Sequence, residues 1–380
     1  MSRPIKVLHI ASGDLWAGAE VQAFTLIAHL ARIANTEVAA VLMNEGMLAE
    51  RLRSAGISTC VLDERRTGSA RLIIRLWHVL RSERPDVIHT HREKENILGS
   101  LANRLCERVP SVRTVHGSQE HGGARGWQGI RRRGIDMLDN WCGRILQGLV
   151  IAVTEELGEH LASRFSGKVA VVENGVDADS VRTEQGVADF RCAEPRATHI
   201  GIVGRLAQVK RIDLFLEAAS LLTRAQLQRE WRFHVFGDGP LRMELEKRTE
   251  ELRIRHVVTF HGHRRDIATC IGGLDGLVIS SDHEGLPMTA LEAAALGIPT
   301  AAHAVGGLRD VVPEEFLVTR HDAIGYRDGI LRVLQADARE ITKTRAELTL
   351  ERFSARRNAE RIRLLYEQLI SRERVIDIVQ

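Results

Sequence analysis

Short runs of β-branched residues alternate with longer helix-forming stretches along the 380 residues of this chain, and the alternation restarts halfway. The first series of strand-like runs lies at 6–10, 37–42, 86–89, 112–115, 149–153 and 169–172. The second series lies at 198–203, 231–236, 257–260, 276–279 and 299–302. Strands that alternate with helices are typical of a parallel sheet covered by helices on both faces. The sequence therefore predicts two α/β halves.

The boundary between the halves is predicted near residue 190, because 175–195 is rich in Asp, Gly and polar residues, as a linker would be. We expect an N-terminal domain over 1–190 and a C-terminal domain over 191–355. Residues 356–380 form a charged helical tail. The sequence leaves the packing of this tail open, and a return onto the N-terminal domain is one alternative.

Composition and charge narrow the function classes. Hydrophobic residues make up 44% and charged residues 27%, which is ordinary for a globular protein. The formal net charge of +3 and the aromatic content of 4% do not indicate a nucleic-acid binder. Neither a G-x-x-x-x-G-K-[ST] loop nor a strict G-x-G-x-x-G occurs, which argues against a P-loop NTPase and a simple dinucleotide-binding domain.

The five cysteines are far apart and show neither metal-ligand nor redox spacing, so we expect small, partly buried hydrophobic residues in a reducing compartment. The N-terminal segment is interpreted as a first strand and not as a signal peptide. No stretch approaches the roughly 20 apolar residues of a membrane-spanning helix. The expected location is therefore cytoplasmic, at most peripheral at the inner face of a membrane.

Two glutamates follow the apolar run that ends at Ser280. Pro287 suits the first turn of a helix and Gly297 suits the residue just past its end. Glu284 then lies in the strand-to-helix loop and Glu292 lies inside the helix. Open α/β sheets bind ligands at the carboxyl ends of their strands, where a carboxylate can accept paired hydroxyls of a sugar or ribose. The alternative is that Glu284 caps the helix and Glu292 lies on a solvated face.

Arg205 and Lys210 bracket the loop that follows the first strand of the second half. Gly204 precedes this pair, and a helix is predicted soon after it. A helix N-terminus with flanking cations makes an anion site suited to a diphosphate. The alternative is two cations that merely solvate a loop.

In the first half, the loop 13–18 is rich in glycine, which lets backbone N–H groups approach a phosphate or sugar, although this signal is weak by itself. His116 directly follows the strand 112–115, so its ring is expected at the same carboxyl edge. His89 and His91 have the spacing of a metal pair, but no carboxylate-rich set completes a site, and we expect no metal.

Taken together, these segments resemble glycosyltransferase family 4, the retaining enzymes of the GT-B fold. The likeness covers almost the whole chain in the right order. The residues that carry it are Glu284 and Glu292, Gly204 to Leu206 with Lys210, Gly18 to Glu20, Thr114 to Gly117, Glu173 to Asp177, Gly237 to Pro240, and Val305 to Gly307. The resemblance implies two Rossmann-like domains whose parallel sheets face each other across a central cleft.

The resemblance also implies the role of each site residue. Arg205 and Lys210 hold the donor diphosphate, Glu292 bonds the ribose hydroxyls, Glu284 contacts the donor sugar, and His116 lies over that sugar. The expected catalytic residues are His116, Arg205, Lys210 and Glu284, and the expected donor-binding residues are Gly18, Arg205, Lys210, Glu284, Gly285, Leu286, Pro287 and Glu292.

Two further details concern how the chain compares with this family. The family generally works without a bound divalent metal, so no cofactor is expected and the nucleotide-diphosphate sugar is the donor substrate. The loop around Gly18 carries a single glycine where the family often has two, which makes its donor contacts the least secure of the transferred roles.

The implied function is transfer of a sugar, with retention, from a nucleotide-diphosphate sugar to a saccharide or lipid-linked glycan, in polysaccharide or cell-envelope glycan biosynthesis. No carboxylate nucleophile is evident, which favours front-face substitution. The alternatives are a sugar-nucleotide epimerase or hydrolase of the same fold, and a non-catalytic subunit that binds the nucleotide sugar. The sugar and the base are left open.

The most basic stretch, 125–133, runs into an apolar helical pattern. Arginine and tryptophan beside apolar residues at helical spacing suit an anionic membrane surface, which would bring the chain close to a lipid-linked acceptor. The alternative is a solvated helix whose tryptophans pack inward. The expected acceptor or membrane contacts are Trp127, Arg131, Arg132 and Arg133.

Overall fold

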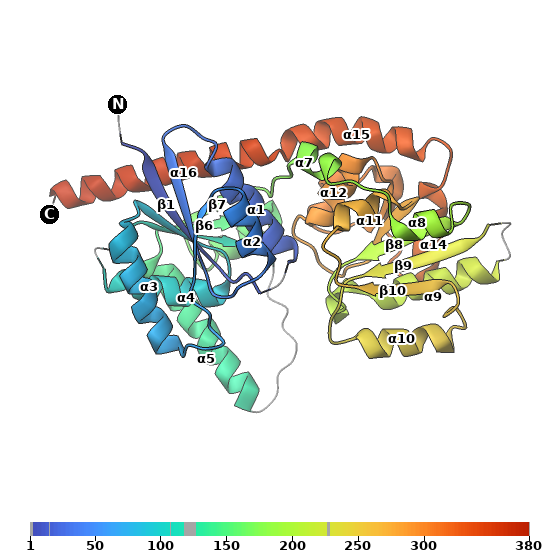
Figure 1. The fold of residues 1–380 in the computed structure, drawn as a ribbon, viewed down its shortest axis with the longest axis horizontal. Coiled ribbons are helices and arrows are strands. Elements are labelled where there is room, and N and C mark those ends of the chain that lie inside the picture. The colour runs from blue at the N-terminus through green and yellow to red at the C-terminus, as the bar shows by residue number, and fades with distance from the viewer. Residues whose placement is uncertain (1–2, 15, 107, 118–126, 226–228, 380) are drawn as a thin grey trace. The chain divides into compact units, whose positions relative to one another are not determined.

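The computed structural model describes residues 3–14, 16–106, 108–117, 127–225 and 229–379. The chain divides into two compact units (Figure 1), of which one comprises Met1–Gly175 with Ala355–Gln380 and the other Val176–Ser354. Each unit is built around one parallel sheet with helices on both faces. The prediction of two Rossmann-like α/β domains is confirmed.

The first unit contains a seven-stranded sheet of order β3-β2-β1-β4-β5-β6-β7. Its strands are β1 Ile5–Ala11, β2 Thr36–Leu42, β3 Ser58–Val61, β4 Val87–Thr90, β5 Ser111–Val115, β6 Leu149–Ala152 and β7 Val169–Val171. The strand order reverses at β1, so β1 and β4 become neighbours and His9 lies opposite His89. Such a switch point is where open α/β sheets bind ligands.

Alternation along β1 sends its side chains into two different cores. Val7 and Ala11 join a cluster with Leu26 of α1 and Tyr366 of α16, whereas Leu8 packs into a cluster on the opposite face. The helices of this unit are α1 Gly18–Leu30, α2 Met47–Ser54, α3 Ser69–Glu83, α4 Glu93–Arg104, α5 Trp127–Trp141, a π-helical segment Cys142–Leu146, α6 Glu155–Ala162 and α16 Ala355–Val379.

The C-terminal tail returns to the first unit, where α16 packs against α1 (Figure 1). Buried apolar side chains fasten it there, among them Ile362 and Tyr366. The tail is therefore part of the first hydrophobic core.

The second unit contains a six-stranded sheet of order β10-β9-β8-β11-β12-β13, with its switch point between β8 and β11. Its strands are β8 Thr198–Val203, β9 Trp231–Phe236, β10 Val258–Gly262, β11 Gly276–Ile279, β12 Thr300–His303 and β13 Leu317–Val318. Its helices are α7 Ala178–Thr183, α8 Asp189–Ala193, α9 Ile212–Arg224, α10 Arg242–Glu251, α11 Ile267–Gly272, α12 Met288–Leu296, α13 Leu308–Val311, α14 Ala323–Val333 and α15 Ala338–Arg352.

The units meet at 175/176, whereas the sequence places the boundary after residue 190. The polar segment between these positions is not a free linker, because it forms α7 and α8 of the second unit. Helix α7 packs on α12. In α8, Arg191 donates hydrogen bonds to the carbonyl of Gly273 and the carboxylate of Asp275, at 2.9 and 2.7 Å. The polar composition of this segment therefore reflects two short surface helices and not a linker.

No helix in the described part of the chain is both long and apolar enough to cross a bilayer.

Candidate functional site

The loops that follow β8 and β11 lie against each other at the carboxyl edge of the second sheet. The Ser280 hydroxyl lies 2.9 Å from the carbonyl oxygens of both Lys210 and Arg211. The backbone N–H of Asp282 donates to the carbonyl of Val209 at 2.8 Å. The structure thus brings together two segments that the sequence analysis selected independently.

Lys210 and Glu284 form an ion pair at this edge. The Lys210 Nζ lies 2.5 Å from Glu284 Oε1, and the buried Ser281 hydroxyl donates to the same oxygen at 2.5 Å. Pro287 is the N-cap residue of α12 and makes no side-chain cap hydrogen bond. The contacts that the structure shows for the Glu284 carboxylate are those to Lys210 and Ser281.

Glu292 lies one turn into α12, and its side chain is only 6% exposed. The alternative that Glu292 belongs to a solvated face is wrong. Arg205 is exposed at the start of the β8 loop, while Leu286 is buried beside the N-terminus of α12. The donor-binding residues predicted in this unit thus occupy one edge of the sheet.

Two adjacent glycines, Gly306 and Gly307, pack against the backbone of the loop that contains Glu284. Gly306 has a φ of +49°, and a Cβ built on it would lie 2.0 Å from the Glu284 carbonyl oxygen. The N–H of Gly307 donates to the carbonyl of Gly285 at 2.9 Å. Any larger side chain at Gly306 would displace Glu284, which gives this glycine a definite structural role.

Sequence reasoning missed a second polar cluster beside the ion pair. Asp282 bonds Arg211 at 3.3 Å and the Nε2 of His321 at 2.9 Å. His303 stacks on His321 with ring centroids 3.7 Å apart, and its Nδ1 lies 2.8 Å from the carbonyl of Ser281. Burial lowers the pKa of His303. These residues come from four separate segments of the chain, so no spacing in the sequence could have joined them.

In the first unit, His116 lies where the sequence predicts, at the carboxyl end of β5. Its ring is half-buried, and neither ring nitrogen has a hydrogen-bond partner among the described residues. Burial lowers the pKa of His116 to about 4, and the nearby cation of Arg92 adds to this effect. His116 is therefore a neutral imidazole at pH 7, and both of its nitrogens are buried without a hydrogen-bond partner among the described residues.

His116 belongs to a row of buried histidines. The Nδ1 of His9 hydrogen-bonds the Nε2 of His91 at 2.9 Å, and the His91 and His116 rings stack with centroids 5.7 Å apart. The nitrogens of His89 contact the Tyr366 hydroxyl at 2.5 Å and the Thr114 hydroxyl at 2.8 Å. Burial holds the pKa values of all three inner histidines well below their usual range.

His9, His89 and His91 offer nitrogens that all lie within 4.8 Å of one another. The sequence analysis considered His89 and His91 as a metal pair and did not consider His9. In the structure, His9 bonds His91, and His89 bonds the hydroxyls of Tyr366 and Thr114. The absence of a metal requirement stays a prediction.

The glycine-rich loop 13–18 precedes α1, with residue 15 outside the described part. Gly18 begins α1, and a Cβ added there would meet no atom within 4 Å. Ala17 takes the place of the family's second glycine with a φ of −134°, which costs alanine nothing. Just inside the helix, the buried Glu20 Oε1 pairs with Arg92 at 2.5 Å. Burial raises the pKa of Glu20 to about 7, against the opposing effect of Arg92.

The predicted membrane contacts lie on α5, although residues 118–126 and the side chain of Trp127 are outside the described part. Arg131 and Arg133 are exposed. Arg132 instead pairs with Glu93 at 2.6 Å and with Asp136 at 3.1 Å, so it is held against the protein.

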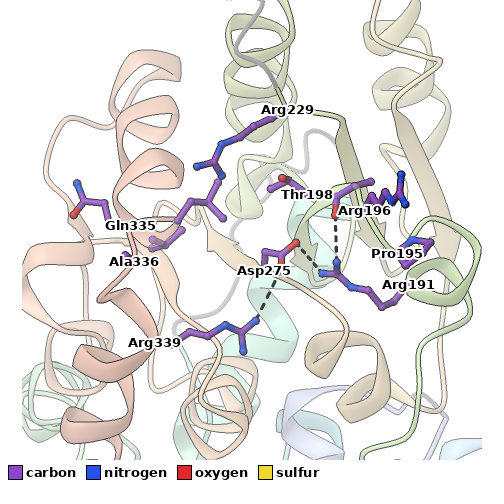
Figure 2. A pocket seen from close by; sticks show the side chains of 12 residues that line it. Arg191, Pro195, Arg196, Thr198, Arg229, Asp275, Gln335, Ala336 and Arg339 are labelled. Carbon is purple, nitrogen blue, oxygen red and sulfur yellow. Dashed lines mark hydrogen bonds and ion pairs between the residues drawn. The ribbon is translucent and has the colours of Figure 1, made fainter.

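A hollow of about 430 Å³ lies at the opposite edge of the second sheet, beside the first residues of β8 and β11. Figure 2 shows Asp275 between Arg191 and Arg339 in its wall. Arg191 also donates to the carbonyls of Gly273 and Ala197, so each of its three guanidinium nitrogens makes a hydrogen bond within the protein. None of the predicted site residues lines this hollow.

Two family models match the chain. Residues 16–180 match the model described as Glycosyltransferase Family 4, and residues 197–336 match the model described as Glycosyl transferases group 1. Together they span most of both units.

Named relatives carry related descriptions. The chain is 26% identical over 275 residues to a UDP-Gal:alpha-D-GlcNAc-diphosphoundecaprenol alpha-1,3-galactosyltransferase from Escherichia coli, which covers 69% of each chain. It is 28% identical over 309 residues to a 2-deoxystreptamine glucosyltransferase from Streptomyces kanamyceticus, which covers 76% of this chain and 79% of that protein.

Solved structures share the fold. Anabaena Alr3699/HepE in complex with UDP and glucose matches with a TM-score of 0.79 and 18% identity, over 96% of this chain and 100% of that one. The sucrose-phosphate synthase of Thermosynechococcus elongatus matches with a TM-score of 0.76 and 21% identity, over 97% and 99% of the two chains.

Proposed function

The chain belongs to glycosyltransferase family 4, and on this premise we propose that it transfers a sugar with retention of anomeric configuration from a nucleotide-diphosphate sugar to a saccharide or lipid-linked glycan. In general terms, the chain is a glycosyltransferase of the GT-B fold that uses a nucleotide sugar. The observation that carries the proposal is the Lys210–Glu284 pair at the switch point between β8 and β11. The Escherichia coli relative, named for a lipid-linked acceptor, supports a role in glycan assembly at the cell envelope.

Charge stabilisation on the leaving group is the main catalytic contribution of the second unit. Breaking the glycosyl–phosphate bond leaves an oxocarbenium-like sugar and a diphosphate that gains negative charge. Arg205 and Lys210 are placed to meet that charge, and such preorganised cations commonly supply the largest share of rate enhancement. Before the donor binds, Glu284 balances the charge of Lys210, so the diphosphate must compete for the remaining N–H donors of the lysine.

Retention proceeds in this proposal by front-face substitution, without a glycosyl-enzyme intermediate. Asp282 and Glu284 are the carboxylates of the β11 loop, and both are ion-paired with cations. Neither is therefore a free nucleophile. The acceptor hydroxyl attacks from the side that the diphosphate leaves, and its proton passes to the departing phosphate. Detection of a covalent glycosyl-enzyme adduct would contradict this course.

The neutral His116 suits hydroxyl recognition. An uncharged imidazole can donate one hydrogen bond and accept another, which matches a sugar hydroxyl better than a phosphate. We propose that His116 contacts the donor sugar. We also propose that no metal takes part, because Arg205 and Lys210 supply the positive charge. Activity that persists in excess EDTA is the expected result.

The test is donor consumption across a panel of sugar nucleotides, measured as release of nucleoside diphosphate. One donor is expected to be consumed slowly alone and faster with an acceptor, and Arg205→Ala is expected to abolish both rates. Arg248→Ala is the matched control, because Arg248 of α10 forms surface ion pairs with Glu217 of α9 and Glu251 of α10. Product anomers read by NMR test retention.

The same panel separates the alternatives. Consumption that no acceptor accelerates would indicate a hydrolase, and a new sugar nucleotide would indicate an epimerase. Tight binding of a donor with no turnover under any acceptor would indicate a binding subunit.

We further propose that α5 docks on an anionic membrane surface. Ile130, Met137 and Trp141 are 65%, 73% and 47% exposed. At about 100° per residue they share one face of the helix within roughly 40°. Arg131 and Arg133 lie on either side of this stripe and have no ion pair in the described residues. An apolar stripe between cations matches the chemistry of an anionic interface. Trp141 does not pack inward.

Vesicle co-sedimentation tests this docking. Vesicles that contain phosphatidylglycerol are expected to bind the protein, and phosphatidylcholine vesicles to bind it much less. Met137→Asp and Arg131→Glu are expected to weaken binding. Met243→Asp is the matched control, because Met243 is 83% exposed on α10 and lies outside the stripe. Equal recovery of all variants would contradict the proposal.

A further inference from the structure

Ser281 connects the proposed donor site to the neighbouring strand. It is buried directly after Ser280, and its hydroxyl donates to Glu284 Oε1 at 2.5 Å. Its carbonyl accepts a hydrogen bond from the Nδ1 of His303, at the end of β12, at 2.8 Å. A continuous chain of polar contacts therefore runs from His303 through Ser281 and Glu284 to Lys210.

The two oxygens of Glu284 differ in their surroundings. Oε1 meets both Lys210 Nζ and Ser281 Oγ at 2.5 Å. Oε2 makes no hydrogen bond within the described ranges, and the side chain is 10% exposed. One carboxylate oxygen is thus committed to the protein, and the other is the oxygen that a ligand can reach.

His303 is held firmly on the other side of Ser281. Because its Nδ1 donates to a carbonyl and burial keeps the ring neutral, its Nε2 carries the lone pair. Its ring stacks on His321 at 3.7 Å with 10° between the planes. His321 is fixed in turn by Asp282 at 2.9 Å and by the hydroxyl of Tyr326 at 2.8 Å. The donor to the Ser281 carbonyl is therefore preorganised.

We infer that Ser281 and His303 are positioning residues that hold Glu284 so that only Oε2 meets the donor sugar. The inference rests on the proposed function. Side chains that contact a substrate are most effective when a surrounding layer of hydrogen bonds locks their rotamers. Ser281→Ala would remove one of the two contacts that hold Oε1 and would let the carboxylate pivot about Lys210, without removing any ligand contact of its own.

Binding to a nucleotide and to its sugar derivative separates positioning from general damage. The probes are UDP and UDP-glucose, or the corresponding pair for the donor that the panel selects. Ser281→Ala is expected to weaken UDP-glucose binding about 10-fold or more and to leave UDP binding nearly unchanged, because Glu284 serves the sugar. His303→Ala is expected to show a smaller effect of the same kind, and His303→Asn, which keeps an N–H donor, to recover part of it.

A double-mutant cycle completes the test. In a Glu284→Ala background, Ser281→Ala is expected to cause no further loss, since the residue acts through Glu284. A loss that persists in this background, or that affects UDP and UDP-glucose equally, overturns the inference alone. A wild-type protein that binds UDP but no sugar nucleotide overturns the proposed function together with it. If Ser281→Ala does not fold, the His303 pair carries the same comparison.

Discussion

At the carboxyl edge of the second sheet, full charges meet in pairs, Lys210 with Glu284 and Arg211 with Asp282. At the carboxyl edge of the first sheet, the row that includes His91 and His116 consists of imidazoles that burial keeps neutral. In the proposed function, the two edges have different tasks. Charged side chains can stabilise a leaving diphosphate, whereas neutral donors and acceptors suit uncharged hydroxyls.

A second row of histidines sharpens this contrast. In the second unit, the His199 Nε2 donates to the Glu194 carbonyl at 2.9 Å, so its Nδ1 accepts from His234 at 2.8 Å. His234 then accepts from His261 at 2.9 Å, and one carbonyl fixes all three tautomers. This row is paired along its length and is interpreted as structural.

The row in the first unit is left incomplete. His9 Nε2 and His91 Nδ1 are buried without a partner in the described chain. Whichever ring donates in the His9–His91 bond, one N–H and one lone pair remain unmatched. Each unmatched group costs about 1–3 kcal/mol. In the proposed function, these groups provide hydrogen-bonding capacity at the carboxyl edge of the first sheet at a cost in stability.

Lys210→Ala should have the largest effect. Removal of a cation from the charged edge leaves the departing diphosphate unstabilised and Glu284 unpaired, so kcat/KM for donor consumption is expected to fall about 100- to 1,000-fold. Lys247→Ala is the control, because the Lys247 side chain on α10 is 76% exposed. This variant should keep wild-type activity. A loss below tenfold would mean that the charged edge does not carry the chemistry.

His116→Ala should cost less, because a neutral contact to a hydroxyl contributes less than a charge. A fall in kcat/KM of about 10- to 100-fold is expected, with thermal stability retained or improved as an unsatisfied buried group is removed. His261→Asn is the matched change in the paired row, and it should lower the melting temperature while kcat stays unchanged. The reverse pattern would exchange the roles assigned to the two rows.

Acid should destabilise the fold through its histidines. The pKa values of His116 and His234 are lowered to about 4 and about 3. Between these values and the unfolded value near 6.5, the unfolded chain binds more protons, so stability present above pH 6.5 is lost as pH falls. His116 alone accounts for about 2 kcal/mol at pH 5.

Glu20 and Glu95 act in the opposite direction, because burial raises both pKa values to about 7 and their cost disappears as pH falls from 7. The histidines outnumber them, so a net fall in melting temperature below pH 6 is expected by calorimetry. Glu20→Gln should stabilise the protein at pH 8. A flat profile between pH 7 and 5 would show that the histidines are solvated.

Gly18→Ala should have the smallest effect. The added methyl group meets open space and the backbone is helical, so stability should change by less than about 0.5 kcal/mol. Unchanged donor KM would remove Gly18 from the donor contacts, and a several-fold rise would place the donor close to this position.

The features that were predicted best from the sequence are those that depend on local sequence patterns. Strand alternation indicated both sheets, and Pro287 with Gly297 marked the ends of α12 to within a residue. The resemblance assigned Lys210 and Glu284 to one donor site, and the structure shows the ion pair between them. The polar segment that forms α7 and α8 was misread because short surface helices and linkers share a composition.

Contacts between distant loops lay beyond sequence reasoning. His303 and His321 stack although 17 residues separate them, and Tyr366 reaches His89 across 277 positions. Such pairs depend on which strands become neighbours in the sheet. The sequence predicted only part of the α5 surface. Its cations could be recognised from the sequence, whereas the outward direction of Trp141 depends on packing.

The return of α16 to the first unit has a consequence for synthesis. A ribosome releases the seven strands of the first sheet and then the entire second unit before it releases Ile362 and Tyr366. Until then, α1 and α2 cover one face of the first sheet without α16, while the second unit already holds every residue of its own core. The domain that begins the chain is thus the last to be completed.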